Sequence, residues 1–191
     1  LEASREELAI FGVCTRMFSL ASFGVAAVYA VTMPDMFESE ANADRTTFNR
    51  KVGEANAVAS LVAILLFVGT VIGAPLALML FGPEFSAGAV PLAILCLSLV
   101  VRSAAGPASI VLSIHDRPWA SLPAIALGLL TLFGANLVLV PAYGLVGASL
   151  SAVIAISIWS LGLWLIAWHT ARLDVSIMQW FRSRRAVVAA E

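Results

Sequence analysis

Long apolar runs separated by short polar stretches make up most of this chain. Five such runs occur, at about residues 8–33, 58–80, 87–114, 119–140 and 145–168. An α-helix needs about 20 apolar residues to cross the hydrocarbon core of a bilayer, and each run is long enough to do so. The pattern therefore predicts an all-α, polytopic membrane protein with five transmembrane helices packed as one bundle.

Polar stretches between the runs mark the predicted ends of the helices. Residues 35–54 are rich in charged side chains, and we expect a solvated connector there that forms a short helix on the membrane surface. Short segments at 82–83, 115–118 and 141–144 contain proline, glycine or both and predict tight turns. The last segment, 169–191, combines arginines with aromatic residues and predicts a basic tail at the membrane interface.

Composition supports a membrane protein and argues against several other classes. Hydrophobic residues make up 61% of the chain and charged residues 12%, whereas soluble domains average roughly 45–50% and 25%. The net charge of −1 gives no sign of a nucleic-acid partner. The two cysteines and two histidines form no cluster at metal-ligand spacing, and no nucleophile with a base and an orienting group is evident. We therefore expect neither an enzyme nor a bound cofactor or metal.

One arginine, Arg102, lies in the middle of the third run. At about 100° per helical residue, it shares a small and polar face with Ser98 and Ser109. A charge at that depth costs about 2.5–3.5 kcal/mol on insertion scales, so such residues usually face a cavity or a partner. The nearby Gly106-Pro107 pair removes a helical hydrogen bond, and we expect a kink there that acts as a hinge. Arg102, Ser98 and Ser109 are thus candidates for the lining of a substrate path.

Two further polar residues inside the runs have two interpretations each. Arg16, in the first run, either extends toward the nearer lipid headgroups or lines the same cavity. Asn136, near the end of the fourth run, either packs between helices or contacts substrate. The sequence leaves both pairs of alternatives open.

The distribution of lysine and arginine predicts the orientation. With five spans, the 35–54 connector, the 115–118 link and the 169–191 tail share one side and together carry eight basic residues, against Arg5 alone on the other side. Basic residues are enriched in cytoplasmic segments, so the C-terminus is predicted to be cytoplasmic. The N-terminal end then lies outside. Since the chain also begins at Leu1, we expect a fragment with helices missing upstream.

The acidic residues indicate what kind of ligand the membrane region would accept. All twelve lie outside the five predicted spans, so the embedded charge is purely cationic. A cation-coupled site would be expected to hold a carboxylate, whereas arginine matches the oxygens of phosphates and carboxylates. The sequence therefore favours an anionic substrate.

Several short motifs together resemble those of polysaccharide-biosynthesis flippases, the Wzx-type members of the multidrug, oligosaccharidyl-lipid and polysaccharide exporter superfamily. The resemblance runs from about residue 6 to residue 176, and its most specific piece is a Pro-x-x-Gly-x-x-Gly-Ala turn. The motifs are Glu6-Glu7-Leu-Ala-Ile-Phe-Gly-Val, Pro34, Leu80-Phe-Gly-Pro-Glu-Phe85, Gly106-Pro107 and Val138-Leu-Val-Pro-Ala-Tyr-Gly-Leu-Val-Gly-Ala148.

The resemblance implies a MATE-like architecture of two six-helix lobes around a central cavity. Such flippases move undecaprenyl-diphosphate-linked oligosaccharides across the bacterial inner membrane by alternating access, for surface polysaccharides such as lipopolysaccharide O-antigen and exopolysaccharide. This chain would then be most of the C-terminal lobe, facing a missing N-terminal lobe of the same protein. Arg102 and Arg16 would be the candidates to meet the lipid diphosphate.

Two other functions remain open from the sequence. A multidrug or cation antiporter of the same superfamily would place a carboxylate in the missing lobe. A structural membrane subunit without transport activity would use its arginines only to pair across a helix interface.

Overall fold

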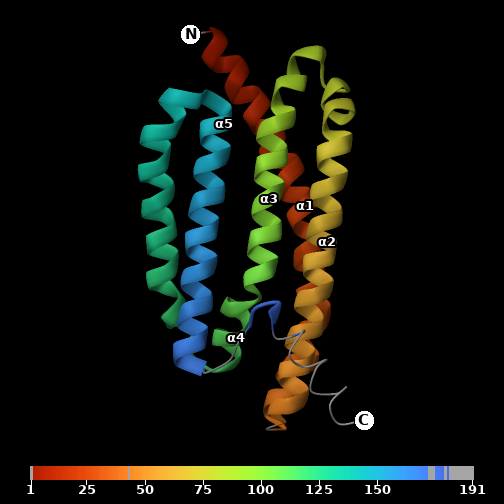
Figure 1. Ribbon diagram of the computed structural model, residues 1–191, viewed down its shortest axis with the longest axis vertical. Helices are drawn as coiled ribbons and strands as arrows, with labels where there is room; N and C mark the ends of the chain where they lie inside the picture. The colour runs from red at the N-terminus through yellow and green to blue at the C-terminus, as the bar shows by residue number, and fades with distance from the viewer. Residues whose placement is uncertain (1, 43, 172–174, 179, 181–191) are drawn as a thin grey trace.

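The computed structural model describes residues 2–42, 44–171, 175–178 and 180. Within these residues all the regular secondary structure is helical, as expected, and there is no strand. Figure 1 shows the long helices aligned along one axis of an elongated bundle. In chain order the elements are α1 (Glu2–Ala41), α2 (Arg45–Met79), η1 (Pro83–Gly88), α3 (Ala89–Ala105), α4 (Ala108–Ile114), η2 (Pro118–Ser121) and α5 (Leu122–Ala171).

Four helical stretches are long and apolar enough to cross a membrane. Many large apolar side chains on these stretches, among them Phe23, Leu65 and Phe133, are exposed, which is compatible with contact to lipid. An all-helical membrane protein is thus supported, but the count of five separate spans is not confirmed. The four stretches are Arg5–Ala41, Arg45–Met79, Pro83–Ile114 and Pro118–Thr170.

The difference in count comes from α5, which folds back on itself without an intervening loop. Gly144 alone leaves the helical conformation, with φ of 54° and ψ of −128°, and Pro141 is accommodated inside the helix. In Figure 1 the two arms, drawn in teal and blue, lie side by side. They pack so closely that a Cβ added to Gly128 would lie 2.9 Å from the Cβ of Trp159. The expected turn at 141–144 is therefore a bend centred on one glycine.

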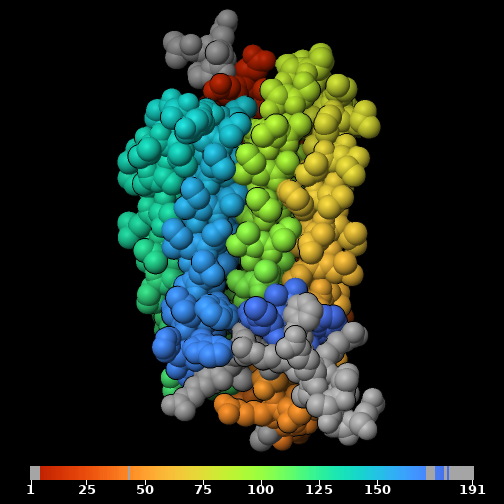
Figure 2. All heavy atoms as spheres, in the orientation of Figure 1, coloured from red at the N-terminus to blue at the C-terminus, as the bar shows by residue number. Residues whose placement is uncertain are grey.

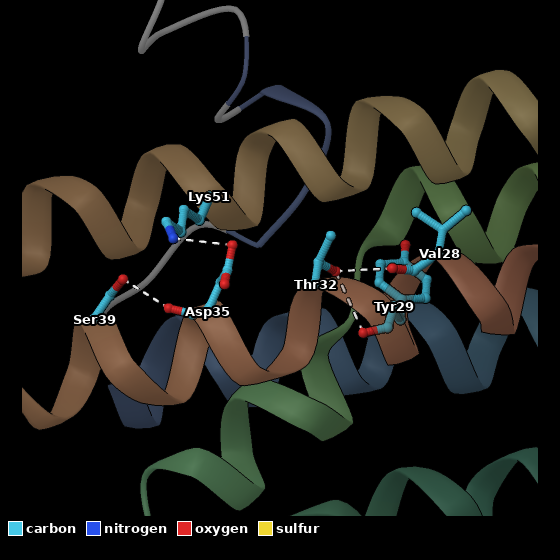
Figure 3. A network of polar contacts seen from close by, with 6 residues as sticks. All are labelled: Val28, Tyr29, Thr32, Asp35, Ser39 and Lys51. Atoms are coloured by element: carbon cyan, nitrogen blue, oxygen red, sulfur yellow. Dashed lines mark hydrogen bonds and ion pairs between the residues drawn. The ribbon is translucent and has the colours of Figure 1, made fainter.

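Residues 35–54 do not form the separate surface helix that the sequence predicts. Instead, α1 continues through Pro34 to Ala41, and α2 begins at Arg45. The two helix ends pair with each other, and Lys51 of α2 forms a 3.0 Å ion pair with Asp35 of α1 (Figure 3). Apolar side chains of this region, including Met36 and Phe48, are fully buried, so the helices extend here by packing against the bundle.

The predicted kink at Gly106-Pro107 is a complete break between two helices. α3 ends at Ala105, Gly106 adopts φ of 87° and ψ of 176°, and Pro107 precedes α4. A positive φ of this size strongly favours glycine, and proline cannot donate a backbone hydrogen bond to continue the helix. The third apolar run therefore consists of η1, α3 and α4 rather than one helix.

α3 is the central helix of the bundle. It packs against α1, α2 and α5, whereas α1 and α5 have almost no contact with each other. Figure 2 shows one face of this arrangement, with the arms of α5, then α3, then α2 side by side. Because α1 and α5 make so few contacts with each other, the side of α3 that carries the exposed Arg102 stays open between them.

Candidate functional site

A small pocket lies in this opening, at the C-terminal end of α3. Its volume is about 80 Å³. Four parts of the chain form its wall: α1, the end of α3, the break with the start of α4, and the second arm of α5. The lining residues are Ser22, Val25, Ala26, Tyr29, Leu99, Arg102, Ser103, Gly106, Pro107, Ser109, Ile110, Trp159, Ser160 and Leu163.

Arg102 is the charged residue of this pocket. It lies in the last turn of α3, where the negative end of the helix dipole favours a cation. Its guanidinium carbon is 5.4 Å from the centre of the Trp159 ring, which is a cation–π contact. Among the described residues, Arg102 forms no ion pair. The guanidinium therefore keeps donors available for an anionic group.

Hydroxyl groups surround this cation. Ser22 and Ser103 donate to the carbonyls of Ser19 and Val100, at 2.8 Å and 3.0 Å. The oxygen of Ser22, which is partly exposed, remains available as an acceptor, whereas Ser103 is fully buried. The hydroxyl of Tyr29 donates to Oδ1 of Asn56 at 3.0 Å. The pocket thus combines a cation, hydroxyl oxygens and aromatic rings.

The indole of Trp159 adds an unusual feature. Its Nε1 is buried and has no hydrogen-bond partner among the residues that the structure describes. Buried polar groups are normally paired, and an unpaired one calls for an explanation. A bound acceptor or a water molecule would satisfy this N–H.

Four of the seven residues that the sequence singles out meet in the pocket. They are Arg102, Ser109 and the two residues of the break, Gly106 and Pro107. Ser98 is not among the lining residues, because it is buried in the helix packing and donates to the carbonyl of Leu95 at 2.6 Å. Its predicted place on the substrate path is therefore not reproduced.

Arg16 and Asn136 also lie away from the pocket lining. The side chain of Arg16 is exposed on α1, which is compatible with both interpretations given for it above. Asn136, on the first arm of α5, donates to the carbonyl of Leu132 at 2.9 Å. That bond pairs one donor of the amide within its own helix, and the structure does not bring Asn136 to the site.

Three residues that matter to the site were not expected from the sequence. Tyr29 and Trp159 line the pocket, and Asn56 is fully buried beside Tyr29. The sequence feature that could have pointed to them is a polar or aromatic side chain within or beside an apolar run. Contacts across α1, α2 and α5 depend on helix packing, which residue spacing alone does not encode.

No group of three or more histidine, cysteine, aspartate or glutamate side chains that could hold a metal ion occurs in the described part of the chain. Comparisons with protein-family models, with curated proteins and with solved structures found no match. Any functional argument therefore depends on the chemistry of the pocket itself. The basic interfacial tail that the sequence predicts has its arginines at positions 172, 182, 184 and 185, which lie outside the described residues.

Proposed function

We propose that this chain is part of a flippase that moves a polyprenyl-diphosphate-linked oligosaccharide across a bacterial inner membrane. In this proposal the two arms of α5 are separate spans, which gives five in total and a cytoplasmic C-terminus. The first arm, from Leu122 to the bend at Gly144, extends about 33 Å at 1.5 Å per residue. That length is enough for the roughly 30 Å hydrocarbon core.

The observation that carries the proposal is Arg102, which has no ion-pair partner among the described residues and lies in a pocket of hydroxyl groups. A guanidinium binds phosphate oxygens through paired hydrogen bonds, and a membrane-embedded cation usually faces a polar path or a partner. Ser22, Ser109 and Tyr29 add the hydrogen-bonding groups that sugars require. A drug-cation site would instead be expected to contain a carboxylate, and none of the described residues that line this pocket carries one.

The size of the pocket supports a site that is only partly formed by this chain. Pockets for small molecules usually span about 300–1,000 Å³, whereas this one measures about 80 Å³. It could hold a single phosphate-sized group. The exposed side of α3 at Arg102 would face a second lobe, which would enclose the rest of the cargo.

Export of surface polysaccharide by a flippase-deficient bacterium tests the proposal. The unaltered chain, expressed together with the second lobe that the proposal implies, should restore export. Arg102→Ala should reduce export at least about tenfold, which is the loss expected when one charged hydrogen-bonding group is removed. Arg102→Lys should retain only part of the activity, since lysine keeps the charge but not the paired donors.

Arg16→Ala is the matched control, because it also removes an arginine from an apolar run, and Arg16 lies outside the pocket lining. It should leave export near the wild-type level at equal protein abundance. Normal export by Arg102→Ala, or equal loss in both variants, would reject the proposed role of the pocket.

A further inference from the structure

The segment 175–178 returns to the end of α3 although it lies about 70 residues further along the chain. The backbone N–H of Ile177 donates to the carbonyl of Ala104 at 3.1 Å, and Val175 is completely buried. In Figure 2 this blue segment sits directly below the green end of α3. The last carbonyls of a helix have no partner within the helix, so the segment supplies a donor that α3 lacks.

Asn56 connects the same segment to two other helices. Its side chain is fully buried in α2. Its Nδ2 donates to the carbonyl of Val175 at 3.2 Å, and its Oδ1 accepts from the hydroxyl of Tyr29 on α1 at 3.0 Å. Together with the Ile177–Ala104 bond, this chain of hydrogen bonds joins α1, α2, the C-terminal segment and α3.

Gly106 makes room for the segment at the break. A Cβ at this position would collide with the carbonyl of Val175, so close approach requires glycine. Gly106 also lines the Arg102 pocket, as do Tyr29 and Ser103. The docked segment therefore lies directly behind the pocket wall.

We propose that residues 175–178 act as a latch that holds the α3–α4 break in one conformation and closes the inner wall of the pocket. Release of the latch leaves the Asn56 amide and the Ala104 carbonyl without their partners. Water or a polar ligand then has to satisfy them, because an unpaired buried polar group is costly. The undocked state therefore has a deeper, more polar pocket and a break that is free to bend. This inference depends only on contacts at the break and does not require the proposed cargo.

A cysteine reporter inside the pocket measures the state of the latch. Ser103 lines the pocket and is fully buried, and the natural cysteines Cys14 and Cys96 are buried as well, so their background reactivity is low. In membrane vesicles, Ser103→Cys should react slowly with a small thiosulfonate reagent. Adding Ile177→Pro, which removes the donor to Ala104, should raise the labelling rate roughly tenfold, the effect expected for one lost buried hydrogen bond.

Ile177→Ala is the matched control, because it shortens the side chain but keeps the backbone donor. It should label within about twofold of the parent reporter, since exposed or partly exposed truncations usually have small effects. Equal labelling rates in the proline and alanine variants would overturn the proposal.

Two independent measurements cover the case in which Ile177→Pro does not fold. Gly106→Ala should raise labelling, whereas Gly134→Ala, at a glycine with open space around it, should not. In the unaltered protein, hydrogen exchange should show the Ile177 amide protected to a degree similar to the end of α3. Exchange as fast as in an unstructured peptide would show that the segment does not dock.

Discussion

At the scale of single residues, Arg102 is stabilised by its surroundings without an ion pair among the described residues. The Trp159 ring and the end of α3 both favour its charge, and neither consumes all of its donors. This arrangement differs from a structural salt bridge, such as Lys51 with Asp35, in which each charge already has a partner. A cation that is held in place but not neutralised is suited to an incoming anion.

A double-mutant cycle tests the contact between Arg102 and Trp159. Arg102→Met and Trp159→Leu should show a coupling free energy of about 0.5–1 kcal/mol in detergent unfolding, which is the usual range for a cation–π pair near a surface. Trp168→Leu is the control, since Trp168 pairs with Trp164 and not with Arg102. Additive effects of Arg102→Met and Trp159→Leu would mean that the contact contributes nothing to stability.

Helical spacing predicted part of this site and missed the rest for a physical reason. It placed Arg102 and Ser109 together, and both line the pocket. It also placed Ser98 with them, but one turn of the same helix is buried while the next is open. Spacing identifies a face of a helix, whereas the neighbouring helices decide which part of that face stays accessible.

At the scale of elements, helix ends differ most from the prediction. Hydropathy shows where apolar segments stop, not where hydrogen-bonded helix stops. α1 and α2 therefore continue as helices through a polar region, with the end of one packed along the start of the other. The turn between them is fixed by Asp44, whose Oδ1 accepts hydrogen bonds from the N–H groups of Thr46 and Thr47 at 3.1 Å and 3.0 Å.

The cap at Asp44 predicts a dependence of stability on pH. Hydrogen bonds from Thr47, and then from Thr46, hold the pKa of this carboxyl below its ordinary value. Because the pKa is lower in the folded chain, the cap contributes fully above the ordinary aspartate pKa of about 4 and is lost as the pH falls through the folded value. Asp44→Asn keeps a capping oxygen without a titrating group.

The Tm of the wild-type protein in detergent should therefore fall more steeply than that of Asp44→Asn as the pH is lowered from about 5 to about 3. Other carboxylates titrate in both proteins, so the difference between the two curves isolates Asp44. Parallel curves would show that the cap does not contribute through its charge.

At the scale of the whole molecule, the ends of the elements separate into two groups. In Figure 1 the start of α1, the α2–α3 connection and the bend of α5 lie at one end of the bundle, and the α1–α2 turn and α4 lie at the other. Gly144 is close to Glu7, with 3.8 Å between a Cβ added there and the carboxylate. The five-span proposal requires such a separation, because an odd number of crossings places the two ends of the chain on opposite sides.

Cysteine labelling in intact cells tests the five-span topology. Tyr143, beside the bend, and Arg117, in the α4–η2 connection, are both exposed. Tyr143→Cys should react with a membrane-impermeant maleimide from outside, whereas Arg117→Cys should react only after permeabilisation, as the distribution of basic residues predicts. Reaction of both variants on the same side would rule out a crossing by the first arm of α5, which lies between them.

The bend at Gly144 leaves no polar loop between the arms of α5, which affects how a ribosome-bound chain would enter the bilayer. Under the five-span arrangement no hydrophilic stretch separates the two arms, so we expect them to enter the bilayer as a pair. The arms would partition into lipid together, already packed against each other where Gly128 contacts Trp159 and Gly162 contacts Ala124. A bulky residue at Gly128 or Gly162 would then act first on protein abundance, because misassembled protein is degraded by cellular proteases. The loss of transport would follow from the lower abundance.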